Sequence, residues 1–306
     1  MDTREAFSGS KLVQSALWRF WGHFPQRLRS FGNRVVEECK QGGFSTVLAT
    51  GIAPLNKEAL GQLKKSGVST INYLTDDPWN SAHHSPWFMN AISYYDKVYT
   101  TKRSNIFDLK KIGCDNVNFC LFGFDKEIHQ FVPMEISEHS GSDILFVGGA
   151  DSDRTSVMQK LIDNQFKMEL YGGYWNTIDR FKQFSRGNAD LLTLAKRGQC
   201  SKISLCLVRR ANRDGHVMRS FEIAASGGCM LVEDTDEHRE IFGTDGECVV
   251  YFANDDQMIS RARWLLQHDH ERLRLRKAVY KKIVLEGNNT YADRLKQILA
   301  MSESVN

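Results

Sequence analysis

The sequence predicts an α/β protein made of two domains, each a parallel sheet covered by helices on both faces. Short apolar runs alternate with helical patterns along the whole chain of 306 residues, and this alternation is typical of parallel sheets. The length suits two domains of ordinary size. Between the halves, the segment 126–142 contains Pro133, mixed charge and a Ser/Gly ending, which predicts a linker. We therefore expect an N-terminal domain over 1–135 and a C-terminal domain over 136–306.

Each half shows its own series of strands and helices. In the first half the expected strands are 46–50, 70–74, 97–100 and 117–121, and the expected helices are about 10–41, 55–66, 86–94 and 103–112. In the second half the expected strands are 144–147, 168–171, 203–208, 230–232 and 248–252. The expected helices there are about 153–164, 188–197, 217–226, 236–242, 255–267, 270–285 and 289–300. Because strands and helices alternate, the motifs that follow strands should converge on one cleft between the two domains.

Composition restricts the class of protein. Hydrophobic residues make up 42% and charged residues 25% of the chain, as in soluble globular proteins. No apolar run approaches the ~18 residues of a spanning helix, and the N-terminus lacks an apolar signal core. The net charge of +3 is too small to indicate nucleic-acid binding. The seven cysteines include no Cys-x-x-Cys pair, so we expect reduced core residues and a cytoplasmic protein.

The first expected helix is both basic and aromatic. Its basic residues are Lys11, Arg19, Arg27, Arg29 and Arg34, and its apolar residues are Leu12, Leu17, Trp18, Phe20, Trp21, Phe24 and Leu28. We favour packing of these aromatics on the neighbouring domain, because amphipathic helices usually face a core. The alternative is peripheral contact with an anionic membrane, at its inner face. A second basic stretch, 261–282, has eight basic residues against two acidic ones.

The segment 214–228 combines two carboxylates with a helix that ends at two glycines. Asp214 precedes Gly215 in a predicted loop, and Glu222 opens an apolar run on the predicted helix. A carboxylate is a good bidentate acceptor for a sugar diol, so two of them at this separation can hold two sugar rings. A loop acid followed by an ordinary amphipathic helix gives the same pattern, since short motifs have many false positives.

Glycines and arginines follow three expected strands of the second half. A turn at Gly148–Gly149 leads to Arg154, and backbone amides at such a turn can bind a diphosphate. After the strand that ends at Tyr171 come Gly172, Gly173, Tyr174 and Trp175. These aromatic rings can stack on a base, and core packing of Trp175 is equally consistent with the pattern. The third strand is followed by four arginines that can neutralise phosphate in place of a metal: Arg209, Arg210, Arg213 and Arg219.

Metal ligands are sparse. Two Asp-x-Asp triplets, 151–153 and 234–236, each precede an expected helix. Either can in principle hold a divalent ion against phosphate, but N-capping is the simpler role and the one we favour. The nine histidines show no zinc spacing. We therefore expect no metal and no cofactor.

Two acids in the first half are candidates for acceptor chemistry. Asp76 and Asp77 directly follow an expected strand, with His83 and His84 close behind. An acid or histidine at a strand end can act as a general base. The Asp-Asp-Pro sequence is equally typical of a turn that caps the next helix. Asp76, Asp77 and His83 are our candidate catalytic residues.

Longer stretches of the chain resemble the CgeB-like (spore maturation protein type) glycosyltransferases. In the second half these are Phe146-Val-Gly-Gly…Arg154, Tyr171-Gly…Trp175, Ser201-Lys-Ile-Ser-Leu, Arg219-Ser-Phe-Glu-Ile and Asn289-Thr-Tyr-Ala-Asp-Arg294. In the first half they are Asn72-Tyr-Leu-Thr-Asp-Asp-Pro78, Tyr95-Asp-Lys-Val-Tyr-Thr100 and Gly113-Cys-Asp-Asn-Val. The resemblance implies a GT-B fold: two Rossmann-like, doubly wound domains that face a cleft.

The resemblance also implies a function and a donor site. A sugar would move from a nucleotide-diphosphate-sugar donor to a hydroxyl acceptor, which is a glycan, a lipid-linked molecule or a small molecule. Glu222 would hold the ribose hydroxyls, and Asp214 would face the donor sugar. Near the diphosphate and the rest of the donor would lie Gly148, Gly149, Arg154, Tyr171, Gly172, Arg213 and Arg219.

Two departures from the family pattern bear on this hypothesis. The chain lacks the usual first strand and helix units, so the N-terminal domain is shortened and its acceptor site is incomplete or completed by another subunit of a homo-oligomer. The last helix can pack back on that domain. Asp214 is one methylene shorter than the usual Glu. The alternatives are a non-catalytic sugar-nucleotide-binding or structural relative, and a nucleotide-sugar epimerase.

Overall fold

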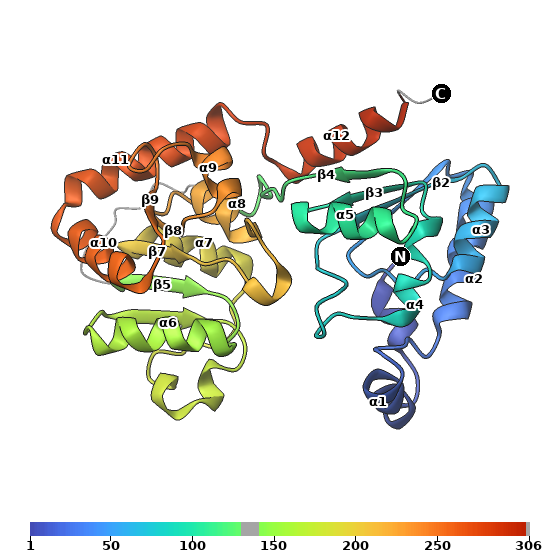
Figure 1. Cartoon of the computed structure of the whole chain (residues 1–306), viewed down its shortest axis with the longest axis horizontal. Helices are drawn as coiled ribbons and strands as arrows, with labels where there is room; N and C mark the ends of the chain where they lie inside the picture. Colours follow the sequence, from blue (N-terminus) through green and yellow to red (C-terminus); the bar gives the residue numbers. More distant parts are fainter. Residues whose placement is uncertain (130–140, 304–306) are drawn as a thin grey trace. The chain divides into compact units, whose positions relative to one another are not determined.

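The computed structural model describes residues 1–129 and 141–303 and consists of two compact units (Figure 1). The N-terminal unit comprises Met1–Leu121 together with Ala211–Arg213. The C-terminal unit comprises Phe122–Arg210 and Asp214–Asn306. The predicted domain boundary at 135/136 and most of the predicted linker lie outside the described residues.

The N-terminal unit is a four-stranded parallel sheet with the order β1-β2-β3-β4. Its strands are β1 (Thr46–Thr50), β2 (Ser69–Leu74), β3 (Lys97–Thr100) and β4 (Val117–Phe119). Its helices are η1 (Thr3–Phe7), α1 (Lys11–Phe20), α2 (Leu28–Gly42), α3 (Lys57–Lys65), α4 (Pro86–Met89), η2 (Ile92–Tyr94) and α5 (Arg103–Lys111). All four predicted strands are confirmed. They were recognisable because strands covered on both faces are nearly continuous apolar runs.

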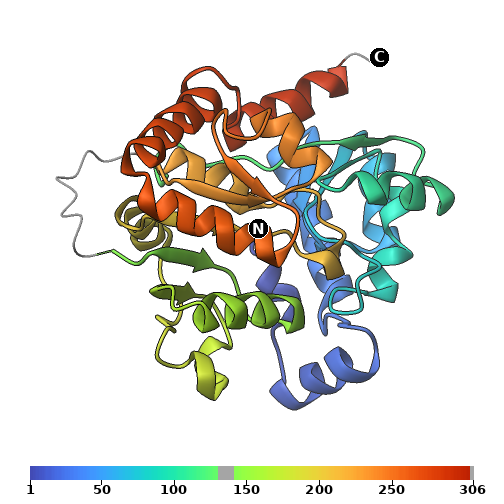
Figure 2. The same cartoon turned by 60° about the vertical axis from the view of Figure 1, so that its left-hand side comes forward.

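The single helix predicted at 10–41 is wrong. The structure has two helices, α1 and α2, separated by a turn in which Gly22 and His23 have φ values of 60° and 57°. Pro25 follows, and a proline has no N–H to continue the helical hydrogen-bond ladder. Because the chain reverses here, α1 lies apart from the sheet at one end of the N-terminal unit in both views (Figure 1 and Figure 2).

The C-terminal unit is a five-stranded parallel sheet with the order β6-β5-β7-β8-β9. Its strands are β5 (Ile144–Val147), β6 (Met168–Tyr171), β7 (Ile203–Cys206), β8 (Met230–Glu233) and β9 (Val250–Phe252). Its main helices are α6 (Ser152–Asp163), α7 (Leu191–Cys200), α8 (Met218–Ala225), α9 (Asp236–Phe242), α10 (Asp255–Gln267), α11 (Asp269–Tyr280) and α12 (Tyr291–Glu303). Short helical turns are η3 (Trp175–Thr177), η4 (Asp179–Phe181) and η6 (Lys281–Leu285), while η5 (Arg210–Asn212) lies mostly in the segment that belongs to the N-terminal unit. The five predicted strands are confirmed, some with shorter bounds.

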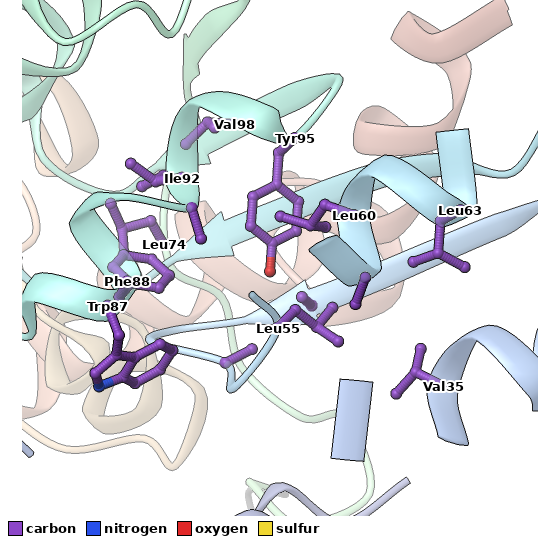
Figure 3. Close-up of a cluster of buried hydrophobic side chains, with 14 of the residues drawn as sticks. Val35, Leu55, Leu60, Leu63, Leu74, Trp87, Phe88, Ile92, Tyr95 and Val98 are labelled. Atoms are coloured by element: carbon purple, nitrogen blue, oxygen red, sulfur yellow. The ribbon is translucent and has the colours of Figure 1, made fainter. Parts of the chain in front are cut away.

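Each unit has its own hydrophobic core. In the N-terminal unit, helices α2 to α4 and η2 contribute Val35, Leu60, Leu63, Trp87, Phe88 and Ile92 (Figure 3). In the C-terminal unit, the core includes Phe146, Trp175 and Phe181. All seven cysteines are free thiols, and six of them are buried, which confirms the expectation of unpaired core cysteines. Within the described residues, no helix is long and apolar enough to cross a membrane.

The aromatic residues of the first predicted helix do not all pack as expected. Phe24 packs against the core of the N-terminal unit, and Leu28 is buried. Leu12, Phe20 and Trp21 instead are 85%, 71% and 62% exposed. The preferred interpretation, in which these aromatics pack on the neighbouring domain, is therefore wrong for Phe20 and Trp21, and Phe24 packs on the core of its own unit.

Candidate functional site

Strand order in the C-terminal unit indicates a binding position at the carboxyl ends of its strands. β5 pairs with β6 on one side and with β7 on the other, so successive connections run in opposite directions from β5. Ligands of open α/β sheets bind at the carboxyl ends of strands at such a switch point. A cavity of about 30 Å³ lies here, enough for one or two waters. It is lined by His129, Leu145, Val147, Leu191, Leu194, Ala195, Gly198, Ser204, Leu205, Arg219, Glu222, Ile223 and Ser226.

Glu222 is the acidic group of this cavity, and it is only 8% exposed. Its Oε2 accepts a hydrogen bond from Nη1 of Arg219, while its Oε1 lies 3.7 Å from Nε2 of His129. Burial lowers the pKa of His129, so its ring is neutral near pH 7 and does not form an ion pair. Oε1 therefore remains an acceptor on the polar side of a cavity whose other side is apolar. Arg219, predicted beside the diphosphate, is the ion-pair partner of Glu222 in this structure, and its place at the diphosphate stays a prediction.

Tyr171 lies on the same face of the sheet as the cavity. It is the register partner of Val147, and paired residues of adjacent parallel strands point to the same face. Its side chain is buried, and burial, with a smaller contribution from Glu169, raises its pKa. The structure thus places Tyr171 beside the cavity wall, as a neutral phenol.

The two glycine turns pack against each other. The N–H of Gly148 donates to the Tyr171 carbonyl at 2.8 Å, and the carbonyl of Gly148 accepts from Nε1 of Trp175 at 2.7 Å. Gly172 has φ of 132°, and a Cβ there would lie 2.4 Å from the Gly148 oxygen. The amide of Gly148 therefore already has an acceptor, and its role as a phosphate donor stays a prediction. Within residues 1–129 and 141–303 the Gly149 N–H has no hydrogen-bond partner.

Trp175 belongs to the core. It is fully buried and makes edge contacts with Phe146 and Phe181, with ring centroids 6.1 and 5.3 Å away. A ring enclosed in this way cannot stack on a base, so core packing is the correct one of the two readings of Trp175. Tyr174, next to it, is 72% exposed.

Two arginines with unpaired nitrogens lie beside the Gly149 turn. Nη1 of Arg154 donates to the Gly149 carbonyl at 3.1 Å, and Arg209 lies 3.9 Å from Asp151. Burial lowers the pKa of Arg154, and the charge of Arg209 lowers it further, while Asp151 and Asp214 act in the opposite direction. The Nε atoms of both arginines are buried and have no hydrogen-bond partner in the described part of the chain. The two buried Nε groups without hydrogen bonds, and the repulsion between two cations that share the single carboxylate of Asp151, favour a bound anion.

The Asp-x-Asp triplets have capping and pairing roles. Asp151 accepts from the Arg154 N–H at 2.9 Å and is the N-cap of α6, as favoured from sequence. In the second triplet the middle residue, Thr235, caps α9, and Asp234 pairs with Arg239 at 2.6 Å. Over residues 1–129 and 141–303, no group of three His, Cys, Asp or Glu side chains could hold a metal ion.

The loop that carries Asp214 is clamped by residues that sequence reasoning missed. Nε2 of His216 accepts from the Phe122 N–H at 3.1 Å, so Nδ1 carries the proton and donates to Glu237 at 2.5 Å. The carboxylate of Glu237 lies so close that a Cβ on Gly215 would be 2.4 Å from its Cδ. The sequence Gly215-His216 directly follows Asp214 and could have drawn attention to this histidine. Its partner Glu237 could not be predicted, because it lies 21 residues further along the chain.

Arg213 and Asp77 form an ion pair in the N-terminal unit. Nε and Nη2 of Arg213 donate to Asp77 at 2.5 and 3.0 Å. Nη1 of Arg213 donates to Asp108 at 2.7 Å, and Nη2 also donates to Asn105. Asp77 is 1% exposed and also accepts from the Trp79 N–H. In this structure Arg213 and Asp77 are therefore each other's partners, and the predicted donor role of Arg213 and base role of Asp77 stay predictions.

Asp76 and His83 form a second pair that is more accessible. Nε2 of His83 lies 3.6 Å from Oδ1 of Asp76, and the two side chains are 27% and 38% exposed. This nitrogen is itself buried and has no hydrogen-bond partner in the described residues, so Asp76 is the accessible member of the pair. The neighbouring His84 is fixed, because its Nδ1 lies 3.0 Å from the Pro78 carbonyl. Of the four residues considered for acceptor chemistry, Asp76 and His83 keep the geometry of a carboxylate–imidazole pair.

Part of the C-terminal unit is similar to one family pattern. Residues 154–300 match a family model described as glycosyl transferase-like. This match covers Arg154, Asp214, Arg219 and Glu222, and it ends within α12. A comparison with curated proteins finds no match.

Solved structures share the fold at low sequence identity. Sucrose-phosphate synthase from Thermosynechococcus elongatus superposes with a TM-score of 0.68 at 9% identity, over 92% of this chain and 79% of its own. HepE from Anabaena in complex with UDP gives 0.63 at 10%, over 98% and 91%. A Listeria monocytogenes protein provisionally assigned as a UDP-N-acetylglucosamine 2-epimerase gives 0.56 at 13%, over 99% and 82%. The chain has the GT-B fold.

Proposed function

We propose that this protein is a glycosyltransferase that moves a sugar from a nucleoside-diphosphate donor to a hydroxyl acceptor, with the donor held by the C-terminal unit. The observation that carries the proposal is the position of Glu222, an acceptor at the switch point of the sheet, opposite an apolar wall. The match of 154–300 to the glycosyl transferase-like pattern supports it. We also propose that the chain is of the CgeB-like type, on the sequence resemblance alone.

In this proposal the nucleoside occupies an enlarged form of the cavity. Oε1 of Glu222 accepts hydrogen bonds from the ribose hydroxyls, and the base packs on the apolar wall formed by Val147 and Leu194. A cavity of about 30 Å³ is too small for a nucleoside, so α7 or the Arg219–Glu222 pair must move on binding. That movement exchanges one hydrogen bond to a carboxylate for others, and its net cost is therefore small.

The diphosphate lies against Arg154, Arg209 and the Gly149 N–H. Their unpaired N–H groups are the donors that a departing diphosphate needs, and a preorganised cationic site stabilises the charge that develops as the bond breaks. Asp214 is close enough to raise the pKa of Arg154, and in this position it faces the donor sugar. Arginines replace a metal ion in this mechanism.

In this proposal Asp76 and His83 activate the acceptor hydroxyl. The Asp76 carboxylate, which is 38% exposed, removes the proton of the acceptor hydroxyl, and the imidazole of His83 beside it holds this carboxylate in place. The acceptor oxygen then forms a bond to the anomeric carbon, and the bond from that carbon to the diphosphate breaks. The products are the glycosylated acceptor and the nucleoside diphosphate.

A nucleotide-binding measurement tests the donor site. We expect UDP, the ligand named for HepE, to bind, and Glu222→Gln to weaken binding by about 1.5–3 kcal/mol, the range for hydrogen bonds to a charged group. By calorimetric titration this is a roughly 10- to 150-fold rise in Kd. The matched control is Glu286→Gln, whose carboxylate is 58% exposed beside Lys281. Equal affinity of wild type and Glu222→Gln for every nucleoside diphosphate tried would remove Glu222 from the site.

Two alternatives share the fold and separate in the same assay. An epimerase converts a nucleotide sugar into an isomer without an acceptor, so product analysis of the donor alone identifies it. A binding protein shows firm nucleotide-sugar affinity but neither hydrolysis nor transfer over a broad panel of acceptors. Release of nucleoside diphosphate by the wild type, lowered at least about tenfold by Asp76→Asn, is the result expected of a transferase.

A further inference from the structure

Helix α1 is attached to the N-terminal unit through its polar side. Nε2 of Gln14 donates to the Phe24 carbonyl at 3.2 Å, and Oε1 of Gln14 accepts from the Gln26 N–H at 3.0 Å. Four residues along the helix, Trp18 contacts Phe7 and His23, with ring centroids 5.9 and 4.4 Å apart. Residues four apart lie on one face of a helix. The face defined by Gln14 and Trp18 is therefore the one turned toward the rest of the unit.

The apolar side of α1 consequently points outward. Leu12, Ala16 and Phe20 are also spaced by four, and the helical repeat places them roughly opposite Gln14 and Trp18. None of the residues of α1 is buried. Leu12 is 85% exposed, Val13 45% and Phe20 71%. An amphipathic helix in a globular protein normally turns its apolar side inward, so this inverted orientation calls for an apolar partner.

The segment that carries this helix has basic residues and no acidic ones. From Ala6 to Val36 the sequence contains no Asp or Glu but five Lys and Arg residues. Lys11, Arg19, Arg27 and Arg29 are exposed; Arg34 pairs with Glu5. Trp21, just after the helix, is 62% exposed. Aromatic and aliphatic side chains bordered by arginines match the boundary between the acyl chains and anionic headgroups of a bilayer.

We infer that α1 docks in the plane of an anionic lipid surface, with Leu12, Val13 and Phe20 in the acyl region and the basic residues on the headgroups. The helix has 10 residues and is about 15 Å long, half the thickness of a bilayer core, so it lies on the surface and does not span it. A second copy of the chain is a poorer occupant, because pairing two such faces brings like charges together. This inference rests on the geometry of α1 and is independent of the proposed transferase activity.

Vesicle sedimentation of the full chain tests the inference. We expect binding to vesicles that contain about one third phosphatidylglycerol and little binding to pure phosphatidylcholine. Binding should weaken strongly in about 1 M NaCl, where the screening length falls to about 3 Å. The double variant Leu12→Ser/Phe20→Ser should lower partitioning at least about tenfold, since it removes two buried apolar side chains. Because both are exposed, its melting temperature should equal that of wild type.

A matched control uses an exposed aromatic on another helix of the same unit. Phe107 on α5 is 65% exposed, and Phe107→Ser should leave vesicle binding unchanged. Equal partitioning of wild type and Leu12→Ser/Phe20→Ser, or no preference for anionic vesicles, would overturn the inference. So would a concentration-dependent dimer that the double variant abolishes while vesicles bind neither protein, which would assign the face to a second copy.

Discussion

Burial of His238 makes the stability of the C-terminal unit depend on pH in a defined window. The ring of His238 is fully buried. Its Nδ1 donates to the Glu233 carbonyl at 2.7 Å, and its Nε2 lies 2.8 Å from Oγ of Ser220, on the helix that carries Glu222. Burial lowers the pKa of His238 to about 4. The imidazole is therefore neutral in the folded protein over the physiological range.

The sign and size of the effect follow from proton binding. In the unfolded chain His238 takes up its proton near pH 6.5, whereas in the folded protein it does so only near pH 4. Below pH 6.5 the unfolded state thus binds more protons, and the free energy of unfolding falls with pH until about pH 4. With 1.36 kcal/mol per pKa unit, the contribution lost is about 2 kcal/mol at pH 5 and about 3 kcal/mol when the titration is complete.

Urea unfolding of wild type and His238→Gln between pH 7.5 and about 4.5 measures this contribution. The variant is less stable at pH 7, but its curve should be flatter than that of wild type by about 2 kcal/mol between pH 7 and pH 5. His270→Gln is the matched control, because that side chain is 94% exposed and its replacement should leave the slope unchanged. Parallel curves for wild type and His238→Gln would refute the assignment of acid sensitivity to this ring.

Three further outcomes follow from contacts described above. Gly172→Ala should destabilise the C-terminal unit by about 2–4 kcal/mol, because its Cβ would lie 2.4 Å from the Gly148 oxygen in a backbone conformation that already disfavours L residues. Thermal unfolding measures the loss, and Gly173→Ala is the control, because nothing lies within 4 Å of a Cβ at that position. Asp77→Asn should lower the free energy of unfolding by about 1.5–3 kcal/mol and leave UDP affinity unchanged. Asp76→Asn should preserve stability and lower turnover at least about tenfold. The reverse pattern would make Asp77 the base. Transfer in excess EDTA should match the untreated rate if arginines neutralise the diphosphate, and a loss restored by Mg²⁺ or Mn²⁺ would contradict the metal-free mechanism.

The strands of this fold could be predicted because burial on both faces leaves a plain apolar pattern. The run Ile144–Val147 and its neighbours are such strands, and their strict alternation with helices limits the architecture to parallel α/β. The break between α1 and α2 was missed although Gly22 and Pro25 lie within it. The apolar period continues through this turn, and periodicity alone cannot show that the chain reverses.

The candidate site was harder to predict, because its roles depend on long-range partners. Asp76 and Asp77 are adjacent and chemically identical in sequence, yet one faces His83 and the other is buried against Arg213, 136 residues away. His129 was missed because it lies in a stretch interpreted as linker. The Gly148–Gly149 turn was located correctly, but only hydrogen-bond geometry shows that the first amide is occupied.

The close approach of Gly215 to Glu237 has a consequence for how this loop can vary. A Cβ at 215 would lie 2.4 Å from the Glu237 carboxyl carbon, so a larger residue at 215 has to displace this carboxylate. Because the carboxylate is the hydrogen-bond acceptor of the buried His216, its displacement costs stability, and the two positions are not independent. Residues 215, 216 and 237 therefore depend on one another, although the third lies in a different loop-to-helix connection from the first two. Single substitutions at these positions are poorly tolerated, and divergence among relatives of this chain is expected to proceed there by paired or triple replacement.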